Sequence, residues 1–168
     1  ENLFLDASAL MYSFDNKPLA TVDYSNTRSV TGASNSGDGY GRYTDGRVRT
    51  AVRHSGDQIE HDRNEGKHTI DIDLRALSTE VSSIFLTLSA WTTPLSHIIR
   101  PEVRCFDPDD KSGEPLVQYE LEDRPTGNHT AVIMARIWRS EPGKPWKVTA
   151  IGELGKGRAN RSPGYKPI

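Results

Sequence analysis

The stretch HTIDIDL, His68–Leu74, alternates apolar and polar residues with a period of two. After His68, isoleucine or leucine stands at positions 70, 72 and 74, and threonine or aspartate stands at positions 69, 71 and 73. Successive side chains of a strand point to opposite faces of a sheet, so this pattern is typical of a half-buried strand. The stretch therefore predicts a strand whose apolar side packs against a core.

Seven other runs are short and rich in β-branched, aromatic or aliphatic residues, and clusters of Asp, Pro, Gly and Ser separate several of them. The runs are LFLDASALMY (3–12), VRTAVRH (48–54), SIFLTLSAW (83–91), IIRPEVRCF (98–106), PLVQYEL (115–121), HTAVIMARIWR (129–139) and WKVTAIGEL (146–154). Short strands joined by regular turns are typical of two packed antiparallel sheets. The sequence thus predicts an all-β protein, an antiparallel β-sandwich with long polar loops.

Helical patterning is scarce, and we expect at most short helical turns. Residues 75–82 (RALSTEVS) predict one short turn or helix, with Ser78 as a possible cap. We expect a single domain at 1–154 with a polar insertion loop at 25–46, which is either functional or mobile because long structureless loops are uncommon in compact domains. Residues 155–168 predict a flexible C-terminal tail.

Composition limits the classes of partner and compartment. The 168 residues include 21 basic and 23 acidic ones, so the near-neutral chain gives no support for a nucleic-acid partner. The longest apolar run, IFLTLSAW (84–91), is far shorter than the ~20 residues of a spanning helix, so no transmembrane segment is expected. A single cysteine, Cys105, cannot form an internal disulfide and favours a reducing, cytoplasmic location.

The tryptophans and the cysteine have ordinary structural interpretations. Trp91, Trp138 and Trp146 each lie in or beside a predicted strand. We expect two of the three to be core residues and one to be available as an anchor on a binding surface. Cys105 lies in an alternating run, where a lone cysteine is typically a small buried residue.

The polar stretch before the quoted strand, His54–His68, allows three interpretations. Its carboxylates and amides surround two glycines and could wrap a calcium ion, although the spacing is not that of an EF-hand. Alternatively, His54, Asp57, His61 and His68 could hold zinc or another transition metal. The third interpretation is a solvated loop that binds nothing. The chain has no nucleophile elbow, P-loop or dinucleotide fingerprint, so we expect no enzyme activity and no catalytic residues.

Several segments in order resemble the TerD-type tellurite-resistance and stress-protein family. LDASALMYSFDNKPL is similar to the family's D-x-D-A-S-A stretch and the turn after it, and HSGDQ followed by HTIDIDL is similar to its H-x-G-D-N loop and next strand. VSSIFLTLSAW, PEVRCFDPDDKSGEPLVQYEL, TAVIMARIWR and PWKVTAIGE then resemble its later strands and turns in sequence order. The resemblance covers nearly the whole chain.

The resemblance implies a β-sandwich that binds calcium through acidic loops at one end. Such proteins act in the response to tellurite and other stresses as binding modules rather than as enzymes. It also implies that N-terminal strands of the family precede the D-x-D motif and are missing here. The chain could accordingly be one part of a larger protein, and its partners are unknown proteins or further domains.

The calcium ligand set departs from the family pattern. Phe4 stands at the first aspartate, Gln58 replaces an asparagine, and Lys67 and His68 stand where the family has carboxylates. A nearby ammonium group opposes a dication, and calcium affinity depends on the number and charge of its oxygen ligands. We therefore expect a degenerate site, weak or empty. The remaining oxygen candidates are Asp6, Asn26, Asp57, Asp62 and Asn64.

Three hypotheses follow. The first is a non-enzymatic TerD-like binding module with a degenerate calcium site that mediates protein interactions. The second is a calcium-dependent conformational switch on the same fold. The third is a metallohydrolase that uses the His54, Asp57, His61 and His68 cluster.

Overall fold

The computed structural model describes residues 5–23, 28–29, 41–42, 48–49, 51–56, 58–60, 65–90, 93–98, 101–120 and 127–157. Almost all of the regular structure in these ranges is β, and the helical element is one short 3-10 turn, η1 (Leu95–His97). The strands are β1 (Leu5–Ser13), β2 (Pro18–Val22), β3 (Arg28–Ser29), β4 (Gly41–Arg42), β5 (Val48–Arg49), β6 (Val52–His54), β7 (Gln58–Glu60), β8 (Glu65–Lys67), β9 (Ile70–Ile72), β10 (Val81–Ala90), β11 (Glu102–Cys105), β12 (Val117–Glu120), β13 (Ala131–Trp138) and β14 (Lys147–Gly155). The predicted all-β class is confirmed.

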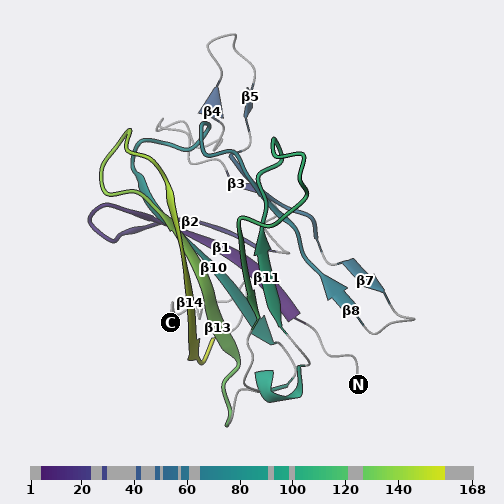
Figure 1. Cartoon of the computed structure of the whole chain (residues 1–168). Coiled ribbons are helices and arrows are strands. Elements are labelled where there is room, and N and C mark those ends of the chain that lie inside the picture. Colours follow the sequence, from purple (N-terminus) through teal and green to yellow (C-terminus); the bar gives the residue numbers. More distant parts are fainter. Residues whose placement is uncertain are drawn as a thin grey trace.

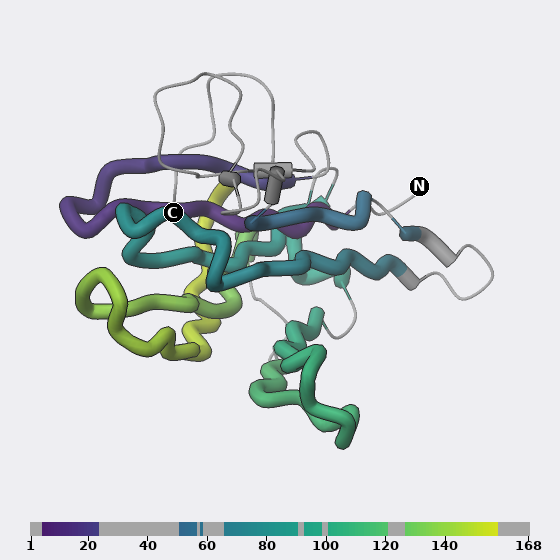
Figure 2. The backbone as a smooth tube through the Cα atoms, turned by 90° about the horizontal axis from the view of Figure 1, so that it is seen from above, coloured from purple at the N-terminus to yellow at the C-terminus, as the bar shows by residue number. Residues whose placement is uncertain are grey.

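The main sheet has five antiparallel strands in the order β14-β13-β10-β1-β2 (Figure 1). The two hairpins β1–β2 and β13–β14 flank β10, and Figure 2 shows them on opposite sides of it. The ladder between β1 and β10 joins segments far apart in the sequence, from Leu5 opposite Ala90 to Ser13 opposite Val81. β14 and β2 are therefore the edges of this sheet.

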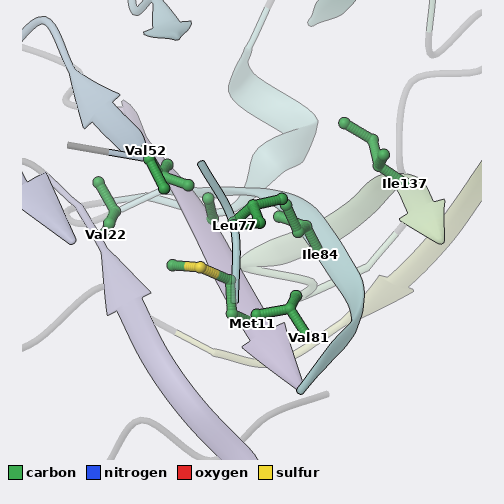
Figure 3. Packing of buried hydrophobic residues seen from close by; sticks show 9 residues of the cluster. Met11, Val22, Val52, Leu77, Val81, Ile84 and Ile137 are labelled. Carbon is green, nitrogen blue, oxygen red and sulfur yellow. The ribbon is translucent and has the colours of Figure 1, made fainter. Parts of the chain in front are cut away.

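A second layer covers one face of the main sheet and completes the predicted sandwich. The three-stranded sheet β3-β6-β9 contributes Val52, Ile70 and Ile72 to a core cluster that also contains Met11 and Ile84 of the main sheet. Figure 3 shows Val52 lying beside Val22 and close to Met11 in this cluster. Each fully buried aliphatic side chain stabilises the fold by roughly 1.5–3 kcal/mol relative to an exposed one.

The β11–β12 hairpin packs over a second cluster at the other end of the sheet. Val103 and Tyr119 from this hairpin contact the buried side chains of Leu95, Val132 and Met134. The two clusters together line one face of β1, β10 and β13. The pleat places the alternate residues of the same strands on the opposite face, called here the outer face.

Two predicted elements differ in detail from the structure. The predicted strand 48–54 is divided between two sheets, because β5 pairs with β4, whereas β6 pairs with β3 and β9. The Asp73 N–H donates to the Ala51 carbonyl at 2.8 Å, in register with the β6–β9 ladder. Of the predicted strand 98–106, residues 99–100 lie outside the described part of the chain, and the described residues form a strand over β11. Segment 25–46 contributes β3 and β4, and the rest of it lies outside the described residues.

The segment before β10 forms turns, as one of the two sequence alternatives predicted. Ser78 Oγ accepts a hydrogen bond from the Glu80 N–H at 3.2 Å, and the Ser78 carbonyl accepts one from the Val81 N–H at 3.1 Å. Ser78 thus caps a turn that leads directly into β10, rather than the start of a helix. No helix in the described part of the chain is long and apolar enough to cross a membrane.

Arg139 joins this turn to the end of β13. Its Nε donates to the Val81 carbonyl at 2.9 Å, and its Nη2 donates to the Ser78 carbonyl at 2.8 Å. The guanidinium carbon lies 4.4 Å from the ring centroid of Trp146, which itself packs against the first core cluster. Arg139 is buried, and desolvation lowers the pKa of its guanidinium below the usual range. Two carbonyls and an aromatic face therefore hold this buried cation.

β14 carries a bulge at Gly152, where the register with β13 shifts between Ile133 and Ala135. Gly152 has a φ of +75°, a conformation that L side chains rarely adopt. The ring of Tyr119 from β12 lies directly against it, so that a Cβ on Gly152 would be 2.8 Å from Tyr119 Cζ and closer still to Oη. The bulge thus allows Tyr119 of β12 to pack directly against the backbone of β14.

The end of β14 extends to Gly155, one residue beyond the expected domain boundary. Gly157 then exchanges two hydrogen bonds with Thr130: its carbonyl accepts from Thr130 Oγ1 at 2.9 Å, and its N–H donates to the same oxygen at 3.1 Å. Residues 158–168 of the predicted tail lie outside the described residues.

Candidate functional site

Of the five predicted oxygen ligands, the structure describes Asp6. It lies on β1 opposite Ser89 and is buried, with 6% of its surface exposed. Its position alternates with Ala9 and Met11, which enter the first core cluster, so the pleat places Asp6 on the outer face. The other four predicted ligands, Asn26, Asp57, Asp62 and Asn64, lie outside the described residues, as do Phe4 and His61.

His54 ends β6 at the base of the polar stretch and is 3% exposed. Its Nδ1 accepts a hydrogen bond from the Gly56 N–H at 2.9 Å, and Gly56 has a positive φ of 79°. A neutral imidazole whose Nδ1 accepts a hydrogen bond carries its proton on Nε2. In this arrangement neither ring nitrogen offers a free lone pair to a metal, and His54 fixes the turn at Gly56.

The base of the polar stretch is closed by hydrogen bonds between its two ends. The Ser55 N–H donates to the Thr69 carbonyl at 2.9 Å, and the Thr69 N–H donates to Ser55 Oγ at 3.0 Å. These bonds continue the β6–β9 ladder beyond His54, which is paired with Ile70. Hydrogen bonds between protein groups therefore hold the two ends of the polar stretch together.

Beyond this base the stretch forms the β7–β8 hairpin, which Figure 1 shows extending away from the sheets. Gln58 pairs with Lys67 and Glu60 pairs with Glu65, so the departures Gln58 and Lys67 face each other across one ladder position. Both are exposed. A regular ladder at this point places the segment in a strand geometry, in contrast to an EF-hand loop, which coils around its ion.

Two of the four residues in the predicted zinc cluster come together. The rings of His54 and His68 have centroids 5.4 Å apart and are tilted by 46°. Across the described ranges, no group of three or more His, Cys, Asp or Glu side chains is placed to hold a metal ion. The remaining members of the predicted set, Asp57 and His61, fall in the undescribed gaps.

A second polar cluster, which sequence reasoning missed, lies on the outer face of the main sheet. The guanidinium carbon of Arg136 lies 5.3 Å from the ring centroids of both Phe85 and Trp138. Lys147 Nζ lies 5.0 Å from the Trp138 centroid, and Trp138 Nε1 donates to Thr149 Oγ1 at 3.0 Å. We call Phe85, Arg136, Trp138 and Lys147 the cation–aromatic cluster.

Three adjacent strands position this cluster. The ladder places Arg136 opposite Phe85 of β10 and opposite Thr149 of β14, and it places Trp138 opposite Lys147. Directly paired residues of antiparallel strands share one face and lie close enough for aromatic and long side chains to interact. Each cation over an aromatic face gains ~0.5–1 kcal/mol at an exposed site.

The predictions for the tryptophans fare differently. Trp146 packs on the core, as expected for two of the three. Trp138 lies on the outer face, which fits the predicted anchor on a binding surface. Trp91 falls outside the part of the chain that is described. Cys105 is half-buried, and burial raises the pKa of its thiol.

The model of the TerD domain family matches residues 40–159. The chain belongs to the TerD family. The matched part of this TerD-family chain runs from β4 past the end of β14 and includes both the β7–β8 hairpin and the cation–aromatic residues of β10, β13 and β14.

Among curated proteins, the chain is similar to the tellurium resistance protein TerZ of Serratia marcescens. The two are 22% identical over 159 residues, which are 94% of this chain and 69% of TerZ.

Two solved structures share the TerD-family fold at 13% identity. One is a homologue of the telluride resistance protein TerD, SCO6318 from Streptomyces coelicolor A3(2), with a TM-score of 0.63 over 94% of this chain and 82% of the other. The other is a protein of unknown function, SAV2460, with a TM-score of 0.59 over 93% of this chain and 79% of the other. At 13% identity, these similarities show a shared fold alone.

Proposed function

We propose that this TerD-family protein is a binding module of a stress response of the tellurite-resistance type, which engages a protein partner in the cytoplasm and catalyses no reaction. The observation that carries the proposal is the cation–aromatic cluster on the outer face. Tryptophan and arginine are enriched at protein–protein interfaces, and here they are held in place by each other and by Thr149. The relative TerZ, named for tellurium resistance, supports the cellular setting.

The cellular part of this proposal can be tested by tolerance to potassium tellurite. A strain of the source organism that lacks the gene should grow less well on tellurite, and the wild-type gene on a plasmid should restore growth. Equal growth of the deletion strain and its parent on tellurite and on other oxidants would contradict the proposed role. A plasmid that encodes a destabilised variant, such as one with a proline inside β10, serves as the negative control.

We propose further that the calcium site is degenerate and that the polar stretch is a scaffold hairpin. Support comes from the base of the stretch, where hydrogen bonds of His54, Ser55 and Thr69 already hold the turn and the two ends together. Support also comes from the β7–β8 ladder, which pairs Lys67 with Gln58 within the stretch. A lysine ammonium beside the site opposes a dication.

Calorimetric titration of chelator-treated protein with calcium, together with a thermal melt, tests this proposal. A ligand that binds only the folded state at 100 times its Kd stabilises it by about 2.7 kcal/mol, so tight binding would raise the melting temperature by several degrees. We expect no saturable heat and no change in the melt up to about 1 mM calcium, the weak end of natural calcium sites.

Other outcomes of this titration have defined meanings. Saturable micromolar binding that Asp57→Ala removes would show a working site and favour the calcium-dependent switch. Stoichiometric zinc, manganese or iron in the protein as purified, lost in His68→Ala, would favour the metallohydrolase. Lys67→Asp restores a carboxylate to the hairpin, and calcium binding gained in this variant alone would identify Lys67 as the cause of the weakness.

A further inference from the structure

β14 is an edge strand whose free side is exposed. It ends the main sheet in Figure 1, with β13 as its one neighbour among the described strands. All five residues from Lys147 to Ile151 are exposed, including the apolar Val148 at 37% and Ile151 at 36%. A long edge strand offers a row of main-chain N–H and C=O groups to any further strand, and proteins usually blunt or cover such edges.

The cation–aromatic cluster lies directly beside this edge. Its two cations, Arg136 and Lys147, form no ion pair with any carboxylate of the described ranges. Arg136 Nε is buried and has no hydrogen-bond partner there. The rings of Phe85 and Trp138 hold the guanidinium in position without neutralising its charge. The cluster therefore presents two fixed positive charges that an anion could neutralise.

The pleat of β14 defines the two sides of the accessible edge. Lys147 and Thr149 lie on the outer face with the cluster, whereas Val148 is paired with Ile137 on the core side. An added strand would thus place alternate side chains next to cations and next to an exposed valine. This alternation selects an extended segment in which acidic and apolar residues take turns.

The accessible edge has a definite end. At Gly152 the bulge changes the direction of β14, and the ring of Tyr119 covers the backbone there. Bulges commonly terminate pairing at the edge of a sheet. The site therefore extends from Lys147 to Ile151.

Two other occupants fit the site less well. The chain's own last residues, 158–168, contain three basic residues and no acidic one, so they cannot supply the missing anions. A single-stranded nucleic acid would need free aromatic faces for its bases, whereas Trp138 has a cation on its ring from each of two neighbours. Charge and alternation together favour an acidic peptide.

We propose that the edge of β14 from Lys147 to Ile151, with Arg136 beside it, binds an extended acidic segment of a partner protein by strand addition. This inference rests on the proposed function as a protein-binding module and names the chemistry of the partner. The main chain of the partner pairs with β14, and its carboxylates reach Arg136 and Lys147 on the outer face.

Fluorescence anisotropy with synthetic peptides tests the inference on the full chain at low salt. The probe is a fluorescein-labelled nine-residue peptide of alternating glutamate and valine. We expect saturable binding that weakens with added salt, and no binding of the matched peptide in which lysine replaces glutamate. A third peptide with the same charges but methylated on alternate backbone nitrogens should bind far less, because methylation removes main-chain donors from the added strand.

Two charge variants locate the site. Lys147→Glu should weaken the glutamate–valine peptide by about three- to tenfold, because an exposed attractive pair becomes a repulsive one. Lys111→Glu makes the same change of net charge on the exposed β11–β12 loop and should leave the affinity unchanged. Two-dimensional amide NMR with the peptide should move the signals of residues 147–151 most.

Each alternative outcome overturns the inference in a definite way. No binding of the glutamate–valine peptide, or equal binding of its methylated form, would exclude strand addition. Tighter binding of a labelled oligothymidylate would indicate a nucleic-acid surface instead. Self-association of the free protein in sedimentation, abolished by Lys147→Glu, would indicate that the edge pairs with a second copy.

The tellurite assay separates this inference from the proposed function. Failure of the wild-type gene to restore tolerance would overturn the function, whatever the peptides do. If the wild-type protein does not bind the glutamate–valine peptide and the Lys147→Glu gene fully restores tolerance, the inference is overturned and the proposed function stands.

Discussion

Replacement of Gly152 by alanine should destabilise the fold through two separate effects. The first is backbone strain, because Gly152 has a φ of +75° and an L-residue in the left-handed region costs roughly 1–2 kcal/mol. The second is steric, because the new Cβ would lie 2.8 Å from Tyr119 Cζ and closer still to Oη. Tyr119 packs against the second core cluster, and overpacking of this kind costs typically 1–3 kcal/mol.

The two effects together predict a loss of about 2–5 kcal/mol in the free energy of unfolding. Urea unfolding followed by tryptophan fluorescence measures this loss directly, provided that the slope with denaturant stays unchanged. In a thermal melt, each kcal/mol should lower Tm by about 2–4 °C for a chain of this size.

A matched control isolates the steric part. Gly143 has nearly the same φ, +79°, but no atom beyond Gly143 and its two chain neighbours lies within 4 Å of the position its Cβ would take. Gly143→Ala should therefore show the strain alone, about 1–2 kcal/mol. Tyr119→Phe in the Gly152→Ala background should recover part of the difference, because it removes the nearest atom but retains Cζ. Equal losses in the free energy of unfolding for the two glycine variants would refute the close packing of Tyr119 against the bulge.

Three further predictions concern Arg139 and Cys105. Arg139→Met should destabilise the fold by about 1–3 kcal/mol in the same urea assay, because the buried Val81 carbonyl loses its Arg139 donor, whereas the Ser78 carbonyl keeps the Val81 N–H. Arg139→Lys should retain part of the stability. A loss under 0.5 kcal/mol for the methionine variant would contradict the role of Arg139 in joining the turn to β13. Cys105 should react with iodoacetamide more slowly than free cysteine at pH 8, because burial raises the pKa of its thiol from 9.0 and reduces the thiolate fraction. For the same reason the folded state holds this proton more tightly than the unfolded state, so the contribution of Cys105 to stability should be present below pH 9 and fall as pH rises further, a slope that Cys105→Ser should remove. Alkylation at the rate of free cysteine would contradict both statements.

Local alternation predicted most of the fold because it reports a local property, the exposure of successive side chains. HTIDIDL contains β9 and the run 129–139 contains β13, as expected. Local patterns carry less information about bends that tertiary contacts impose. The run 48–54 is divided because β5 pairs with β4 while β6 pairs with β3 and β9, and no local feature of this run signals a change of partner.

A change of register in β13 explains why the sequence pattern did not predict the cation–aromatic cluster. Met134 and Ala135 are adjacent, yet both are buried. The pairing of β13 with β10 shifts between Ile133 and Ala135, which leaves Met134 as an extra residue in a bulge. A strict alternation counted from Val132 would therefore assign Arg136 to the core face. The contribution of Phe85 depends on the pairing of β10 with β13, segments that turns and a further hairpin separate in the sequence.

The calcium candidates show the opposite balance. Their residue types suggested a site, but the structure describes Asp6 alone among them and places it on the outer face of β1. His54 belongs to the alternative transition-metal set rather than to the calcium candidates, and its Nδ1 accepts a hydrogen bond from the Gly56 N–H. Spacing in a sequence cannot show which ring nitrogen is already occupied.

The order of strands in the main sheet bears on how the chain can be cut and synthesised. The family match begins at residue 40, after β1 and β2, although β1 lies between β10 and β2 in the sheet. A fragment trimmed to the matched region would leave the ten-residue strand β10 with an open edge and would be prone to aggregate. During translation, β1 must likewise wait until more than seventy further residues have left the ribosome before its central partner is complete. Its early hairpin with β2 keeps that waiting strand from being fully unpaired.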